Sequence, residues 1–152
     1  MNIELILSRS GSVVVRIENL IRAAKHSIDA ALYRFNQQRL VEGLAAAARR
    51  GVRVRVVLDR NKYEESRATR ELFAVGTVPF RLLYGRQGPG SKMHHKFAIF
   101  DGHTALTGSY NWTIESEEQN FESLLILANA DEIALYQNEF ESLWAEAVPP
   151  AE

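Results

Sequence analysis

An alternation of apolar strands and amphipathic helices limits this chain to a small set of folds. Residues 27–33 (SIDAALY) are predicted to form a buried strand, and residues 52–58 (VRVRVVL) a second one. Between them, residues 37–50 carry leucine, valine and alanine at helical spacing, and Gly51 follows where a helix would end. Because strands and helices alternate early in the chain, we expect an α/β fold.

The later pattern predicts a mixed sheet that is flanked by helices on both faces. The pair Asp101–Gly102 separates two apolar runs, residues 94–100 and 104–107, and is typical of a hairpin turn. Residues 83–93 are expected to form a glycine-rich loop that either shapes a substrate entrance or only connects two strands. The remaining expected elements are strands at 2–7, 79–83 and 120–127, helices at 13–25 (capped by Ser10 or Ser12), 64–74 and 131–147, and a turn at 111–116.

Length and composition fit one globular domain spanning residues 1–152. The chain is 46% hydrophobic and 24% charged, as ordinary globular proteins are. It has no cysteine, which excludes disulfides, cysteine nucleophiles and thiolate zinc sites. The first residues lack a basic region followed by a long apolar run, so we expect no signal peptide and no transmembrane helix. A cytoplasmic protein is therefore expected, or a periplasmic one if a signal has been removed.

The charges are distributed unevenly along a chain whose net charge is −1. Residues 34–70 are rich in arginine and lysine, whereas residues 115–152 carry acids and no basic side chain. This pattern is compatible with one positive face that guides a polyanion, or with two solvated helix faces of opposite sign. Within the basic stretch, Arg34 and Arg60 are candidates for substrate binding.

Polar side chains are expected to meet at the ends of three neighbouring strands. Because side chains alternate along a strand, His94 and Lys96 should point the same way and His95 the other way. The same rule pairs Ser109 with Asn111, and Asn120 with Glu122. If the three segments are neighbours in the sheet, these groups gather in one pocket.

This set of side chains suits a phosphodiester. Lys96 and Asn111 can hold the non-bridging oxygens, and Ser109 can donate a further hydrogen bond. A neutral nitrogen of His94 can attack phosphorus, and Glu122 can accept a hydrogen bond from the other ring nitrogen and so fix the tautomer. The residues alone do not provide an acid for the leaving group.

Other interpretations of the histidines and of Ser109 are weaker. A zinc site built from His94, His95 and His103 is unfavourable because adjacent strand histidines point apart, so we expect no metal and no cofactor. We expect His95 to pack on or bond to the opposite face, and His103 to be a solvated turn residue. Ser109 lacks the Gly-x-Ser-x-Gly pattern of a serine nucleophile, so it is expected to bind phosphate or to cap a turn.

Asp101 and the nearby aromatic residues also allow two roles. Asp101 should face away from His94 and lies in the turn, which favours a structural role. Tyr110 and Trp112 could stack on nucleic-acid bases, with Tyr33 and Tyr84 as further candidates, although aromatic residues on strands often belong to the core.

The spacing of this motif resembles that of the phospholipase D superfamily. The family pattern is His-x-Lys, four residues, Asp, six residues, and then Gly-Ser-x-Asn. The matching residues here are His94, Lys96, Asp101, Gly108, Ser109 and Asn111, with Asn120 and Glu122 at the downstream acidic position. The resemblance implies a phospholipase D-like fold, and small members with a single motif are nucleases or Zucchini-type proteins.

The resemblance also implies a homodimer in which two motifs share one metal-independent site. His94 of one copy would form a phosphohistidine, and His94 of the other would protonate the leaving oxygen and activate water. We therefore expect a low-specificity endonuclease acting on DNA or RNA. The alternatives are a phospholipid phosphodiesterase or phosphatidyl transferase, and a non-catalytic nucleic-acid binding module. No basic amphipathic helix is evident, so we expect no stable membrane association.

Overall fold

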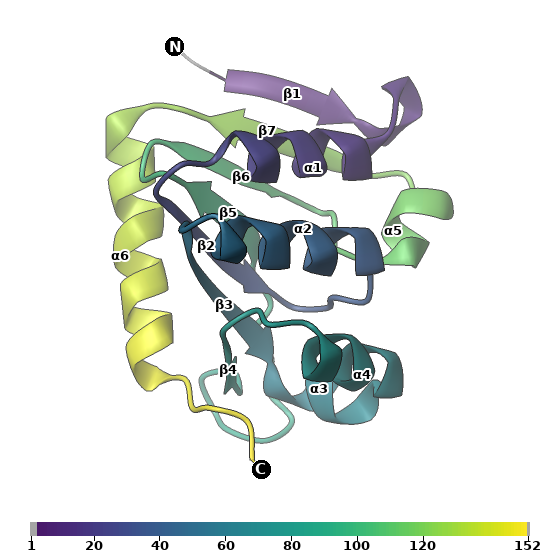
Figure 1. Cartoon of the computed structure of the whole chain (residues 1–152), viewed down its shortest axis with the longest axis vertical. Coiled ribbons are helices and arrows are strands. Elements are labelled where there is room, and N and C mark those ends of the chain that lie inside the picture. The colour runs from purple at the N-terminus through teal and green to yellow at the C-terminus, as the bar shows by residue number, and fades with distance from the viewer. Residues whose placement is uncertain (1–2, 152) are drawn as a thin grey trace.

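The described part of the chain forms one seven-stranded mixed sheet with helices on both faces (Figure 1). The structure is a computed structural model that describes residues 3–151. The strand order across the sheet is β1-β7-β6-β5-β2-β3-β4. The strands are β1 (Ile3–Leu7), β2 (Ser27–Leu32), β3 (Arg53–Asp59), β4 (Phe80–Leu83), β5 (Lys96–Phe100), β6 (Thr104–Gly108) and β7 (Ser123–Leu127). The helices are η1 (Ser8–Ser10), α1 (Val13–Ala23), α2 (Gln38–Arg49), α3 (Arg60–Glu65), α4 (Arg67–Val75), α5 (Ile114–Glu118) and α6 (Ala130–Glu146).

The centre of the sheet joins the two halves of the chain. Strand β2 pairs in parallel with β3 on one side and antiparallel with β5 on the other. The helix α2 connects β2 to β3, as a parallel crossover requires. Because β5 and β6 form the expected hairpin next to β2, the ends of β2, β5, β6 and β7 lie along one edge of the sheet.

Two hydrophobic cores lie on opposite faces of the sheet. Ala30 of β2 packs with Ile17 of α1 and Leu44 of α2, whereas the next residue, Ala31, packs in the core that contains Phe140 of α6. This alternation places α1 and α2 on one face and α6 on the other. The mixed sheet with helices on both faces is therefore confirmed.

Several element boundaries differ from the expected ones. The predicted helix at 64–74 is two helices, because Asp59 caps α3 and Ser66 caps α4. The predicted turn at 111–116 contains the start of α5, whose cap is Thr113. Strand β5 begins at Lys96 rather than at residue 94, and β7 begins at Ser123 rather than at residue 120. The two polar segments of the motif therefore precede their strands instead of forming part of them.

Other expectations about the fold agree with the structure. Ser12, and not Ser10, caps α1 by accepting a hydrogen bond from the amide of Val15. The expected start of the first strand at Asn2 lies outside the described residues. Among residues 3–151, no helix is both long enough and apolar enough to cross a bilayer.

Candidate active site

His94 and Lys96 lie together at the edge of the sheet, where the chain enters β5. The ammonium nitrogen of Lys96 is 3.4 Å from Nδ1 and 3.5 Å from Nε2 of His94, and 3.1 Å from its backbone carbonyl oxygen. His95 points to the other face, where its Nε2 lies 2.8 Å from the carboxylate of Glu139 on α6. The predicted opposite directions of the two neighbouring histidines are thus observed.

A second polar cluster lies where β6 ends and β7 begins. The Ser109 hydroxyl donates a short hydrogen bond to Glu122, and the Asn120 amide donates to the other carboxylate oxygen at 3.0 Å. Gly108 makes this approach possible, because a Cβ atom there would lie 2.2 Å from the carbonyl oxygen of Ser123. Sequence spacing therefore correctly placed Ser109, Asn120 and Glu122 together.

The expected contact between Glu122 and His94 is not observed. Within residues 3–151, both oxygens of Glu122 are engaged by Ser109 and Asn120, and no hydrogen bond joins them to the His94 ring. The expectation that Glu122 fixes the tautomer of His94 in the same chain is therefore wrong for this structure. Partial burial lowers the pKa of Lys96 below its ordinary value. The negative charge of Glu122 raises the same pKa, but less strongly.

The surroundings of His94 favour its neutral form. Partial burial lowers the pKa of His94 first, and the positive charges of Lys96 and Lys92 lower it further. The negative charge of Asp59 raises the same pKa, but less strongly. A lowered pKa leaves a free ring nitrogen at neutral pH, which is the form that can act as a nucleophile.

Tyr33 is a site residue for which the sequence predicted only a possible stacking role. It follows β2, and its amide donates to the carbonyl oxygen of His95 at 2.9 Å. Its ring meets the His94 ring edge to face, with 4.5 Å between centroids, and the Lys96 ammonium lies 5.4 Å from the Tyr33 centroid. The sequence could have indicated this role, because Tyr33 directly follows the strand that pairs with the motif strand β5.

Asn111 carries the one buried side-chain nitrogen or oxygen among residues 3–151 that has no hydrogen-bond partner. Its side chain is half-buried, and Oδ1 is buried without a hydrogen-bond partner among residues 3–151. Buried polar atoms are nearly always paired in folded proteins, so Asn111 differs from the other buried polar side chains of residues 3–151.

Asp101 lies at the opposite end of β5 from Lys96 and has a structural environment. Its carboxylate accepts hydrogen bonds from the backbone amides of Lys25, His26 and Ser27 at 2.6–3.1 Å. These bonds hold the start of β2 against the β5–β6 turn, where Asp101 adopts a φ of 57°. This position agrees with the structural role that the turn sequence predicted.

Of the two roles considered for Tyr110 and Trp112, base stacking is contradicted by their burial and the core role is confirmed. Each is only 1% exposed. The Tyr110 hydroxyl donates to Glu117 at 2.9 Å, and the Trp112 ring packs against Phe35 in the core. Strand alternation could not reveal this, because the chain turns inward after Ser109 towards α5.

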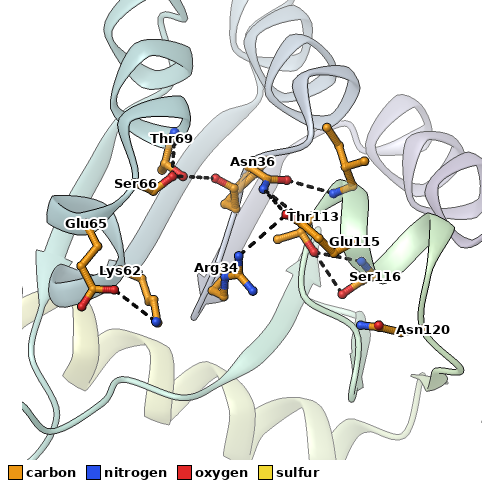
Figure 2. A network of polar contacts seen from close by, with 12 residues as sticks. Arg34, Asn36, Lys62, Glu65, Ser66, Thr69, Thr113, Glu115, Ser116 and Asn120 are labelled. Carbon is orange, nitrogen blue, oxygen red and sulfur yellow. Dashed lines mark hydrogen bonds and ion pairs between the residues drawn. The ribbon is translucent and has the colours of Figure 1, made fainter.

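The two candidate arginines lie near the site but are already paired. Arg34 is 3.9 Å from Glu115 (Figure 2). It also lines a pocket of about 280 Å³, together with Tyr33 and Lys62. Arg60 bonds to Glu64 at 2.8 Å and lies over the Tyr84 ring. The three histidines considered for zinc do not converge, and within residues 3–151 no three His, Asp or Glu side chains gather around a possible ion.

Comparisons with known proteins agree with this architecture. The family described as "Cardiolipin synthase, PLD-like domain" matches residues 17–144. Mitochondrial cardiolipin hydrolases of Xenopus tropicalis and Homo sapiens are each 34% identical to the chain over 94% of its length. The matched regions cover 66% and 55% of those relatives, so the chain spans only part of their length.

Two solved structures match nearly the whole chain. A phospholipase D family member, Nuc from Salmonella typhimurium, superposes with a TM-score of 0.87 and 26% identity over 99% of both chains. NucT from Helicobacter pylori superposes with a TM-score of 0.85 and 20% identity, over 98% of this chain and 100% of its own. The spaced motif, the fold and the family match together show that this chain belongs to the phospholipase D superfamily.

Proposed function

We propose that this protein is a metal-independent phosphodiesterase that cleaves nucleic acid through a phosphohistidine on His94. The observation that carries the proposal is the contact of His94 with Lys96 at the edge of the sheet, with Ser109 and Glu122 on the adjacent strand ends. A neutral imidazole beside an ammonium group is equipped to attack a phosphorus atom while the cation holds a phosphoryl oxygen.

The proposed reaction has two displacements at phosphorus. In the first, a ring nitrogen of His94 bonds to phosphorus, and the bond from phosphorus to the leaving oxygen breaks. In the second, water attacks the phosphohistidine, the nitrogen–phosphorus bond breaks, and the phosphate monoester is released. Lys96, Ser109 and the amide of Asn111 stabilise the charge on the non-bridging oxygens in both steps.

The leaving oxygen needs a proton, and among residues 3–151 the other three histidines lie away from the His94 ring. His95 is engaged by Glu139 on the far face, and His26 and His103 lie near Asp101 at the opposite end of β5. We propose that His94 of a second copy donates this proton and then takes one from the attacking water. Two such imidazoles titrate as a coupled pair, one neutral and one protonated.

An exposed apolar surface beside the site supports pairing of two copies. Phe121, next to Glu122, is 82% exposed, and Leu5 on the edge strand β1 is 60% exposed. Leu5 pairs with Leu125, and Leu7 pairs with Ser123, so this surface is continuous with the segment that carries Glu122. The Arg9 guanidinium lies 4.6 Å from the Phe121 ring centroid, and large exposed apolar side chains on adjoining segments are typical of interaction sites.

A turnover assay in a chelator tests the proposal. Plasmid DNA, a single-stranded oligonucleotide, RNA and cardiolipin vesicles are each incubated with the protein, with His94→Asn and with His103→Asn. We expect cleavage of nucleic acid by the wild type and by His103→Asn, and loss of cleavage in His94→Asn. Substantial turnover by His94→Asn would refute the proposed nucleophile.

A second candidate function is hydrolysis of a phospholipid. It is favoured by the curated relatives, which are named mitochondrial cardiolipin hydrolases and are 34% identical to this chain. The same residues could attack a lipid phosphodiester. Hydrolysis of cardiolipin without cleavage of any nucleic acid in the assay above would select this candidate.

A further inference from the structure

The glycine-rich segment 85–92 is a closed loop held by its own hydrogen bonds. The Gly85 amide donates to the carbonyl oxygen of Ser91 at 3.1 Å, and the Ser91 amide donates to that of Gly88 at 3.0 Å. The Ser91 hydroxyl also donates to the Gly88 carbonyl at 2.6 Å and accepts from the Gln87 amide. The loop is therefore more than a flexible connector.

The closed loop is anchored directly beside His94. The side-chain amide of Asn61 donates to the Ser91 carbonyl at 3.1 Å, and the buried carboxylate of Asp59 accepts from the Met93 amide at 2.8 Å. A Cβ atom on Gly85 would lie only 2.3 Å from the amide nitrogen of Lys92. The loop can close in this form only because Gly85 lacks a side chain.

Arg86 and Lys92 of the loop line a pocket between the loop and the end of α6, and both His94 and His95 also line it. The pocket has a volume of about 410 Å³, and Tyr84 forms part of its wall. Both cationic side chains are exposed. Glu146 of α6 is the acid that lines the same pocket, and the guanidinium of Arg60 lies over the Tyr84 ring at 4.9 Å.

Unlike Arg86 and Lys92, two other cations that line a pocket beside Tyr33 are paired with carboxylates. Lys62 bonds to Glu65 at 3.2 Å, and Arg34 approaches Glu115 (Figure 2). By contrast, no carboxylate among residues 3–151 lies within ion-pair distance of Arg86 or Lys92. Cations without a protein partner, set beside a nucleophile in a pocket, are suited to bind an anionic part of the substrate.

We propose that Arg86 and Lys92 form a second phosphate subsite, which binds the phosphodiester next to the one attacked by His94. The subsite rests on the proposed function and extends it to substrates with successive phosphodiester groups. Lys92 is two residues from His94, a backbone span of at most about 7 Å, so its ammonium can reach a group adjacent to the reacting one. The backbone of a nucleic-acid strand presents such a series of phosphates.

Binding to a strand that is not cleaved tests the subsite directly. In a His94→Asn background, the dissociation constant of a fluorescent thymidine decamer is measured by anisotropy at several salt concentrations. Replacing both cations, Arg86→Gln with Lys92→Gln, should weaken binding about tenfold. It should also reduce the slope of the logarithm of the dissociation constant against the logarithm of the salt concentration by about 1.4, because two contacts to a single strand are lost. The matched control, Arg22→Gln with Lys25→Gln, removes the same charge beyond the far end of the sheet.

Equal losses in both charge-removal variants would overturn the subsite, because net charge alone would then explain binding. Gly85→Ala provides a second test that removes no charge. It should weaken binding by displacing the loop, and circular dichroism and thermal melting show that the variant is folded. Unchanged binding in folded Gly85→Ala would contradict the idea that the closed loop positions the two cations.

A kinetic comparison separates failure of the subsite from failure of the proposed function. Bis(p-nitrophenyl) phosphate has one phosphodiester and reports the chemistry at His94. The ratio of kcat/KM for an oligonucleotide to that for this ester should fall about tenfold in the Arg86 and Lys92 double variant. If the wild type hydrolyses only lipids, the corresponding ratio compares kcat/KM for cardiolipin, which has two phosphodiesters, with kcat/KM for phosphatidylglycerol, which has one. An unchanged ratio in either case overturns the subsite.

Discussion

At the scale of single residues, the charge state of His94 links the structure to the reaction. Burial and the two nearby lysines lower its pKa from the ordinary value of 6.5, so the neutral nucleophile persists to lower pH. Protonation abolishes the nucleophile. The acid limb of the pH profile of kcat/KM for bis(p-nitrophenyl) phosphate should therefore lie below pH 6.5. Because the two His94 imidazoles of the proposed dimer titrate as a coupled pair, both should affect the shape of this limb.

Removing one of these charges gives a prediction with a definite sign. Because the charge of Lys92 lowers the pKa of His94, Lys92→Gln should move the acid limb towards higher pH. The pH–rate profile of Arg22→Gln serves as the control and should match that of the wild type. A limb that moves to lower pH, or does not move, would contradict this description of the site.

Asp101 should affect stability rather than chemistry. Asp101→Ala removes an acceptor of three backbone amides and a residue that tolerates positive φ, so unfolding in urea should show a loss of about 2–4 kcal/mol. Asp101→Asn, which keeps one oxygen, should lose less. Folded Asp101→Ala should retain its kcat; a large loss of kcat without a loss of stability would contradict the structural role.

The stabilisation by Asp101 should also depend on pH. Burial raises the pKa of Asp101, but the backbone amides that bond to the ionised carboxylate together lower it more, so the pKa lies below 3.8. A lowered pKa in the folded state contributes stability that is present above 3.8 and is lost as the pH falls through the folded-state value. Urea unfolding at acidic pH should therefore show a smaller difference between wild type and Asp101→Ala than at pH 7.

Individual site residues were predictable where the side-chain alternation of a strand continues just beyond the end of that strand. His94 and Lys96 share a side as alternation requires, and His95 points away. The role of Tyr110 was wrong because its burial depends on how the chain turns after β6, a tertiary feature that local spacing does not contain. Arg86 and Lys92 were missed because isolated cations in a glycine-rich loop have no distinctive pattern.

At the scale of elements, the close packing of β6 against β7 determines the distance between Ser109 and Glu122. Gly108→Ala would place a Cβ atom 2.2 Å from the Ser123 carbonyl, so the strand ends must separate. We expect lower stability and a loss of at least about tenfold in kcat/KM, because the phosphate-binding donors move. Gly43→Ala in α2, where the nearest atom is 3.6 Å away, should instead stabilise the protein by about 0.5–1 kcal/mol. Wild-type activity in Gly108→Ala would contradict the proposed role of this contact.

The order and type of most elements could be predicted, but their ends could not. Hydrophobic periodicity identified the strands and the long helices because burial on a regular element has a fixed period. The break between α3 and α4 was missed, although Ser66 caps the second helix, because one serine among polar residues is a weak signal. Strand ends were equally hard to locate, so the two predicted strands included polar residues that precede β5 and β7 in the structure.

At the scale of the whole molecule, one chain contains half of the proposed reaction centre. The imidazole of His94, whose pKa is lowered, the buried Oδ1 of Asn111 and the exposed apolar surface around Phe121 all lie at or near one edge of the sheet. A second copy at this edge would contribute the missing acid. The association of two copies is therefore the claim on which the proposed mechanism depends most.

The rate of a purified mixed dimer tests this claim most directly. Wild-type and His94→Asn chains carrying different affinity tags are produced together, and the species with both tags is isolated by two successive purifications. An unactivated phosphodiester that the wild type cleaves is used, because its poor leaving group requires the acid. If two His94 side chains share each site, the mixed dimer should be slower than the doubly tagged wild-type dimer by about 100-fold or more. A rate close to half that of the wild type would show that each chain acts alone and would contradict the account.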